Sequence, residues 1–153
     1  MNQSKSAIAI FGGSFNPPGL HHRQLAVTLL ARFERVLAVP CGYRQDKMDA
    51  AEGKLAWLES GLRRRSIEAT FAGLPGLEID WSDLGNPAFT PTIDLAARYH
   101  DRGELWFVAG ADLFAGGAAG LSQIQRTWRE GPRIWRELSW ALECFHTNAI
   151  RIK

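Results

Sequence analysis

Apolar residues occur in short continuous runs along the chain, and stretches with a helical spacing of apolar residues separate these runs. Residues 7–11, 36–39 and 105–109 have the length expected of strands that are buried on both faces. Glycine or proline follows each of these runs, so we expect the strands to end there. Residues 77–81 alternate between apolar and polar positions, which predicts a strand with one partly polar face. Residues 141–145 are a candidate fifth strand.

Helical patterns lie between the predicted strands. Apolar residues recur at three- and four-residue steps over 22–33, and leucines at similar steps mark a helix over 55–62 after a polar loop at 41–53. Thr92 is a good N-cap for a third helix, and a Trp-rich helical segment precedes the last strand. Regular alternation of strands and helices predicts an α/β, Rossmann-like fold, with a parallel sheet of about five strands and helices on both faces. We expect one domain over residues 1–153.

Composition and charge narrow the class of protein. Hydrophobic residues make up 46% of the chain, enough for one buried core, and the net charge is only +2. Arg63–Arg65 is the one basic run and is expected to be a solvated helix face, so we predict no nucleic-acid partner. Cys41 and Cys144 lack metal-site spacing, which indicates a reducing compartment and no structural metal. The first apolar run is too short to span a membrane, and the predicted location is the cytoplasm.

In a parallel sheet of this kind, ligands bind beyond the carboxyl ends of the strands. Two of these ends carry distinctive residues, Gly12 to His22 and Gly110 to Asp112. The first segment does not have the G-x-G-x-x-G spacing of dinucleotide-binding dehydrogenases. Its paired glycines allow close approach to a phosphate, and its histidines lie at the mouth of a helix, where the dipole favours anions. This end of the sheet therefore predicts a phosphate cradle.

The loop after the first strand reads Gly-Gly-Ser-Phe-Asn-Pro over residues 12–17. In this respect the chain resembles the nucleotidyltransferase superfamily with the T/H-x-G-H motif, and specifically its nicotinate-mononucleotide adenylyltransferase branch. Residues 89–94 are similar to that branch's Y-T-[IV]-D-T helix start, and Gly-Ala-Asp at 110–112 is similar to its adenine-side G-A-D. The resemblance runs from about residue 7 to 112 and implies transfer of an adenylyl group from ATP to a pyridine mononucleotide, with release of pyrophosphate, in NAD biosynthesis.

Two segments depart from the family pattern. The H-x-G-H motif reads Gly-Leu-His-His at 19–22, so that only His22 aligns directly and His21 is a neighbouring substitute. Near the C-terminus, residues 145–151 loosely match the family's I-S-S-T-x-I-R segment and end at Arg151, with no following helix. We therefore expect the C-terminal part of the domain to be shortened.

The resemblance implies a role for each matching residue. His22, with His21, would be the catalytic donor to the α-phosphate, and Mg²⁺ would accompany ATP. Thr92 and Trp128 would contact the acceptor, while Trp135 and Trp140 are expected in the core because they lie at helical spacing. The residues expected to bind nucleotide or phosphate are Gly12, Gly13, Ser14, Phe15, Asn16, Lys47, Gly110, Asp112 and Arg151.

Two alternatives stay open at the level of sequence. The altered histidine motif and short C-terminal part fit a nucleotide-binding domain of the same fold without turnover. The other alternative is a related nucleotidyltransferase with a different acceptor, such as phosphopantetheine or a cytidylyl substrate. Sequence assigns no residue to the choice between nicotinate and nicotinamide, and it does not indicate the oligomeric state.

Overall fold

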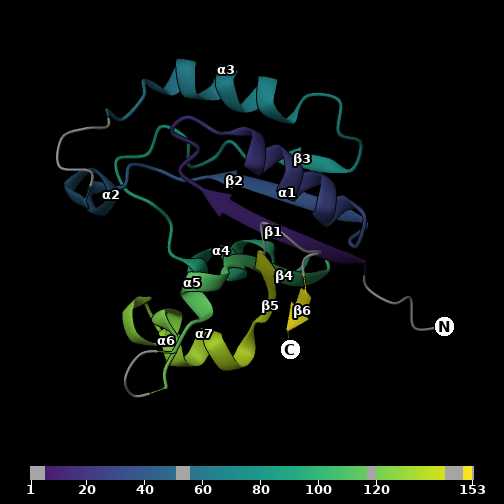
Figure 1. Ribbon diagram of the computed structural model, residues 1–153, viewed down its shortest axis with the longest axis vertical. Helices are drawn as coiled ribbons and strands as arrows, with labels where there is room; N and C mark the ends of the chain where they lie inside the picture. Colours follow the sequence, from purple (N-terminus) through teal and green to yellow (C-terminus); the bar gives the residue numbers. More distant parts are fainter. Residues whose placement is uncertain (1–5, 51–55, 117–119, 144–149, 153) are drawn as a thin grey trace.

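The chain forms one six-stranded sheet with helices on both of its faces (Figure 1). The computed structural model describes residues 6–50, 56–116, 120–143 and 150–152. The strand order is β3-β2-β1-β4-β5-β6, and β1 to β5 are parallel. The strands are β1 (Ala7–Gly13), β2 (Arg35–Pro40), β3 (Leu77–Ile79), β4 (Glu104–Gly110), β5 (Ser139–Glu143) and β6 (Ile150–Ile152).

The prediction of five parallel strands in a Rossmann-like α/β fold is confirmed. The sixth strand, β6, was not predicted, and it pairs with β5 in the antiparallel direction. The described helices are α1 (Leu20–Leu30), α2 (Gln45–Ala50), α3 (Ser60–Phe71), α4 (Thr92–Tyr99), α5 (Ala111–Phe114), α6 (Gln123–Thr127) and α7 (Gly131–Glu137).

Strand β1 contributes to a separate apolar core on each face of the sheet. Ala9 and Phe11 point toward α1 and α3, whereas Ile8 and Ile10 point toward α4, α6 and α7. Side chains alternate between faces along a strand, so a run of apolar residues is needed where both faces are covered. Figure 1 shows the two layers, with α1 and α3 on one side of the sheet and α4 to α7 on the other.

The order of the strands leaves a crevice beside β1. The chain runs outward from β1 to β2 and β3, and then returns to form β4 on the other side of β1. The connections that follow β1 and β4 therefore leave the sheet in opposite directions. Ligands bind at such a switch point, outside the carboxyl ends of the strands.

Two predictions about helix starts are wrong. Thr92 is the first residue of α4 and not its N-cap, because the carbonyl of the extended Pro91 already accepts hydrogen bonds from the Asp94 and Leu95 amides. Helix α3 starts at Ser60, where the Glu59 carboxylate caps the Gly61 and Leu62 amides.

The expected leucine stripe of α3 is also wrong. Leu62 is 44% exposed, and Leu58 precedes the helix. The buried stripe is instead Arg63, Ile67 and Phe71, at four-residue steps. The solvated-face prediction therefore fails for Arg63, which is 0% exposed, although Arg64 and Arg65 are exposed.

Two smaller corrections concern the connections. The segment 41–53, expected to be a loop, contains helix α2 over Gln45–Ala50. Trp140 is a core residue, as expected, but it lies on β5 and not on a helix. Trp135 lies on α7 and packs against the same core. Leu55 and Cys144 lie outside the described residues.

Candidate active site

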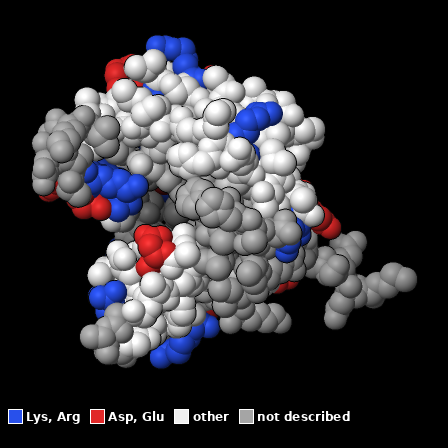
Figure 2. Space-filling model, in the orientation of Figure 1, with Lys and Arg blue, Asp and Glu red and all other residues white. Residues whose placement is uncertain are grey.

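A cavity of about 990 Å³ lies at the carboxyl ends of β1, β2 and β4. Its walls come from the end of β1, from the loop after β2 with the start of α2, and from the segment before α4 with the start of that helix. The end of β4, the start of α5, and α6 with the residues that follow it complete the walls. Figure 2 shows a hollow on the left of the molecule, with basic and acidic atoms at its rim. The predicted site residues that line this cavity are Gly12, Gly13, Lys47, Thr92, Gly110, Asp112 and Trp128.

The loop after β1 is held from its core side. Phe15 has a left-handed φ of 43° and is 1% exposed, with its ring packed edge-on against Phe11 and Phe71. A Cβ at Gly13 would come within 3.1 Å of the Phe15 ring, so the backbone turns tightly there. Asn16 is tied to the segment before α3, donating to the Ala56 carbonyl at 2.9 Å and accepting from the Leu58 amide at 2.7 Å. Phe15 and Asn16 thus shape the loop rather than line the cavity.

His22 is neutral and its proton lies on Nε2. The backbone N–H of Gly19 donates to His22 Nδ1 at 2.9 Å, which leaves only Nε2 for the proton. Burial, together with the nearby charges of His21 and Lys47, lowers the pKa of His22 to about 4. The rings of His21 and His22 are 3.9 Å apart, and neither residue is in the cavity lining. At neutral pH His22 therefore offers an N–H donor and no positive charge.

Helix α2 and the residue before it bring basic side chains toward the loop after β1. Lys47 Nζ donates to Ser14 Oγ at 3.2 Å, linking α2 to the loop after β1. Arg44, which the sequence did not single out, lines the cavity and lies 4.5 Å from the Phe89 ring centre. Two hydrogen bonds of 2.7 and 2.6 Å to Asp46 hold its guanidinium and raise the pKa of Arg44. Because Asp46 neutralises Arg44, Lys47 carries the uncompensated charge on this wall.

The opposite wall carries the adenine-side and acceptor-side candidates. Gly110 ends β4 and precedes α5, and a Cβ at this glycine would lie 2.6 Å from Asp112 Oδ1. Glycine therefore allows the exposed Asp112 carboxylate to fold back over the start of α5. Trp128 follows α6, is partly buried, and packs edge-on against Trp140 with ring centres 6.1 Å apart. The side chain of Arg151, on β6, lies outside the described residues.

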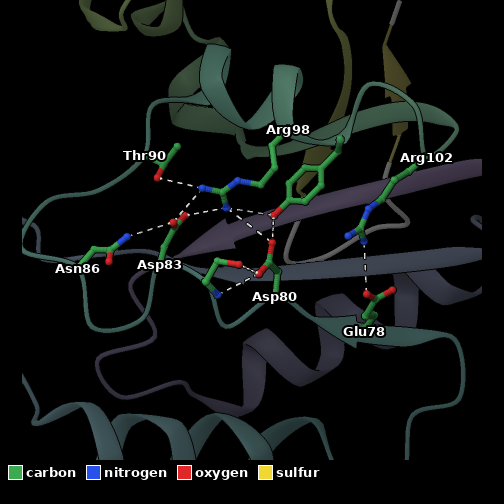
Figure 3. A network of polar contacts seen from close by, with 9 residues as sticks. Glu78, Asp80, Asp83, Asn86, Thr90, Arg98 and Arg102 are labelled. Atoms are coloured by element: carbon green, nitrogen blue, oxygen red, sulfur yellow. Dashed lines mark hydrogen bonds and ion pairs between the residues drawn. The ribbon is translucent and has the colours of Figure 1, made fainter.

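A polar network joins the end of β3 to α4 (Figure 3). Arg98 binds both carboxylate oxygens of Asp83, at 2.9 and 3.1 Å, and Asp83 is 2% exposed and lines the cavity. Arg98 also reaches Thr90 Oγ1 at 3.4 Å and Asp80 at 3.6 Å. Tyr99 donates to Asp80, and burial together with this bond raises the pKa of Tyr99 to about 12. The network fixes the segment that carries Thr90 and Thr92 into the cavity wall.

This network was missed from sequence, because Arg98 and Asp83, like Tyr99 and Asp80, are fifteen or more residues apart and belong to different elements. Two loops, at residues 42–43 and 86–88, also lie close together in this wall of the cavity. The Tyr43 amide donates to the Asn86 carbonyl at 3.0 Å, and Gly42 is packed so tightly on Ala88 that no side chain fits there. The spacing between the two loops is thus set by backbone contact.

The described residues meet neither the requirements of a metal site nor those of a membrane-spanning helix. Within the parts of the chain given above, there is no cluster of three or more His, Cys, Asp or Glu side chains that could hold a metal ion. None of the described helices has the length and apolar character needed to cross a bilayer. Cys41 has a free thiol, and burial raises its pKa.

Comparison with other proteins supports the resemblance found in the sequence. No protein-family model matches the chain. It is 34% identical over 110 residues to a probable nicotinate-nucleotide adenylyltransferase of Maridesulfovibrio salexigens, covering 69% of this chain and 49% of that protein. It is 28% identical over 140 residues to the protein of the same name from Bordetella avium, covering 88% and 62% respectively. The chain thus spans roughly half to three fifths of the length of these relatives.

Solved structures support the fold. The nicotinic acid mononucleotide adenylyltransferase of Plasmodium falciparum complexed with NaAD superposes with a TM-score of 0.65 at 23% identity, over 90% of this chain and 63% of that one. The same enzyme complexed with APC gives a TM-score of 0.61 at 20% identity, over 90% and 63%. These superpositions show a shared fold. At such low sequence identity they show nothing more, so any argument about function depends on the residues in the site.

Proposed function

We propose that this chain, which is similar to the nicotinate-nucleotide adenylyltransferases in sequence and in fold, joins ATP to nicotinate or nicotinamide mononucleotide. The 5′-phosphate of the mononucleotide attacks the α-phosphorus of ATP, the new phosphoanhydride bond forms, and the bond to the β-phosphate breaks to release pyrophosphate. The observation that carries the proposal is the shared cavity, since the Gly-Gly turn, Lys47, Gly110, Asp112 and Trp128 all line it at the switch point of the sheet.

The phosphate side of the cavity suits the triphosphate of ATP. Backbone amides of the loop after β1 and the Lys47 ammonium would hold phosphate oxygens, with Mg²⁺ arriving as part of the ATP substrate. Lys47 already contacts Ser14, so the cation and the loop are held together. His22 would donate its Nε2–H to the α-phosphate, with His21 beside it. A neutral donor there needs no proton transfer, because both reactants are already phosphorylated.

The other side of the cavity suits two heterocycles. Gly110 and Asp112 would face the adenosine, while Thr92 and Trp128 would contact the pyridine nucleotide, with the indole available for stacking. A volume of about 990 Å³ is at the upper end of the range for ligand pockets, as a site for two nucleotides requires. Arg151 would complete the phosphate contacts, and we expect the protein to work in the cytoplasm on small nucleotides, without nucleic acid.

The test is pyrophosphate release by the purified chain with ATP, Mg²⁺ and nicotinate mononucleotide, repeated with the nicotinamide form. We expect release that falls on the order of a hundredfold in Lys47→Ala and in His22→Ala, the usual scale for loss of one positioned donor. Arg64→Ala is the matched control, because Arg64 is exposed, and its contacts with Glu68 and with the Trp81 ring lie outside the cavity lining.

One outcome would contradict the proposal, and a second would contradict only the role given to His22. Nucleotide binding without release in every acceptor mixture would indicate a binding domain that lacks turnover. Release that is unchanged in His22→Ala would remove His22 from the reaction while leaving the adenylyltransferase itself in place.

A further inference from the structure

Arg63 is the largest fully buried side chain among the described residues, and it lies on α3, away from the charged surface. Its guanidinium donates to three backbone carbonyls: Nε to Ser14 at 2.8 Å, Nη1 to Leu84 at 3.2 Å, and Nη2 to Cys41. These carbonyls belong to the connections that follow β1, β2 and β3. One side chain therefore binds three loops at the same edge of the sheet.

The surroundings of Arg63 lack the anion that normally accompanies a buried arginine. No carboxylate in the described parts of the chain forms an ion pair with it, and its charge faces the three carbonyls and the Trp57 ring, 4.7 Å from the guanidinium carbon. Burial lowers the pKa of the guanidinium, because the charged form loses hydration. Burying a charge in this way is costly, and a planar fork is needed to satisfy three acceptors at once.

Each of the three loops continues into the cavity. Cys41 lines it directly, Leu84 follows the lining residue Asp83, and Ser14 follows the lining residue Gly13. Ser14 is held from both ends, since its carbonyl accepts from Arg63 and its hydroxyl accepts from Lys47. The path from Arg63 through Ser14 to Lys47 links a residue outside the cavity to the phosphate-binding wall.

We propose that Arg63 is a positioning residue that holds the loops after β1, β2 and β3 in the arrangement that receives the ATP phosphates, acting through Ser14 and Lys47. This inference rests on the proposed function. Arg63 touches neither substrate, and its contribution is to keep the Ser14 backbone and the Lys47 ammonium at a fixed separation.

The first experiment compares Arg63→Lys with Arg64→Lys, an exposed neighbour on the same helix. A lysine keeps the charge but cannot bind three carbonyls in one plane. We expect Arg63→Lys to raise the KM for ATP and the Kd for a non-hydrolysable ATP analogue about tenfold to a hundredfold, the effect of losing a hydrogen bond to a charged group. The KM for the mononucleotide should change less, and Arg64→Lys should match the wild type.

A double-mutant cycle separates positioning from a general loss of structure. If Arg63 acts through Lys47, then Lys47→Ala weakens binding of the ATP analogue much less in the Arg63→Lys background than in the wild type. Independent, multiplying effects would overturn the proposal. Equal losses for ATP and for the mononucleotide would do the same.

Hydrogen exchange of the wild-type chain gives a second test that needs no variant. Binding of the ATP analogue should slow amide exchange together in the loops at 12–16, 41–43 and 83–86. Protection confined to the first loop would overturn the proposal. Because this measurement uses the wild-type chain, it tests the proposal even if Arg63→Lys does not fold. Failure of the proposed function is distinguishable, because the wild-type chain itself would then release no pyrophosphate with any acceptor, whether or not it binds nucleotide.

Discussion

Two arginines tie loops together on the two sides of the cavity, and they do so by different chemistry. Arg63 is fully buried and binds only backbone carbonyls, whereas Arg98 is partly exposed and binds the carboxylates of Asp83 and Asp80. Carbonyls do not titrate, so the contacts of Arg63 are independent of pH. Carboxylates in general do titrate, and the Arg98 side chain that binds them also meets solvent. The side proposed to hold the phosphates is thus joined by contacts that do not titrate, and the side proposed to hold the acceptor is joined by ion pairs.

The largest expected effect comes from removing the carbonyl-bound arginine. Arg63→Met removes the donor from three carbonyls, in one buried and two partly buried hydrogen bonds, and we expect the free energy of unfolding to fall by about 3–5 kcal/mol. Urea unfolding measures this loss. Arg64→Met, at an exposed position, should cost less than about 0.5 kcal/mol. A small effect at Arg63 would mean that water or a neighbouring donor satisfies the carbonyls.

Removing the carboxylate on the opposite side should have a smaller effect. Asp83→Asn weakens the bidentate pair with Arg98, and we expect a loss of about 1–2 kcal/mol, because Arg98 stays partly hydrated. The KM for the mononucleotide should rise, since the pair holds the segment that carries Thr90. Asp94→Asn is the control, because its pair with Arg129 is exposed at both ends. Equal losses at Asp83 and Asp94 would contradict a special role for the network.

The last effect depends on pH and concerns His22, which lies at the start of α1. His22 has a pKa of about 4 in the folded chain and an ordinary value of 6.5. The unfolded chain therefore binds the proton first as pH falls, and stability that is present above pH 6.5 should decline between 6.5 and 4. His22→Asn keeps an acceptor for the Gly19 amide but does not titrate, so its midpoint of urea unfolding should decline less over that range.

The matched control for this titration is His100→Asn, an exposed histidine that lies after α4. Its unfolding midpoint should follow the pH dependence of the wild type. If His100→Asn flattened the curve and His22→Asn did not, the low pKa assigned to His22 would be wrong.

Much of the fold could be predicted because burial on both faces leaves a direct trace in sequence. Continuous apolar runs mark β1, β2 and β4, and the glycines that end β1 and β4 mark the edge of the sheet where the cavity lies. Lys47 was predicted near the phosphates by resemblance, and the structure brings it to Ser14. These features depend on local pattern or on a motif.

Features that depend on long-range contact could not be predicted in the same way. Arg63 was taken as solvated because three arginines in a row are usually exposed, yet Ile67 and Phe71 at four-residue steps put it on the buried face of α3. That spacing was a usable signal. The sequence holds no such signal for the pairing of Arg98 with Asp83, because this pairing depends on how α4 packs beside the end of β3.

The pairing of β1 with β4 also has a kinetic consequence. Ile10 pairs with Phe107, so the contact that creates the crevice joins segments separated by most of the described chain, and such contacts form slowly. The two halves of the sheet can assemble from nearer segments first, but the cavity exists only once β4 has docked on β1. We expect nucleotide affinity to appear in the last phase of refolding, which would make binding of an ATP analogue a reporter of the fully native chain.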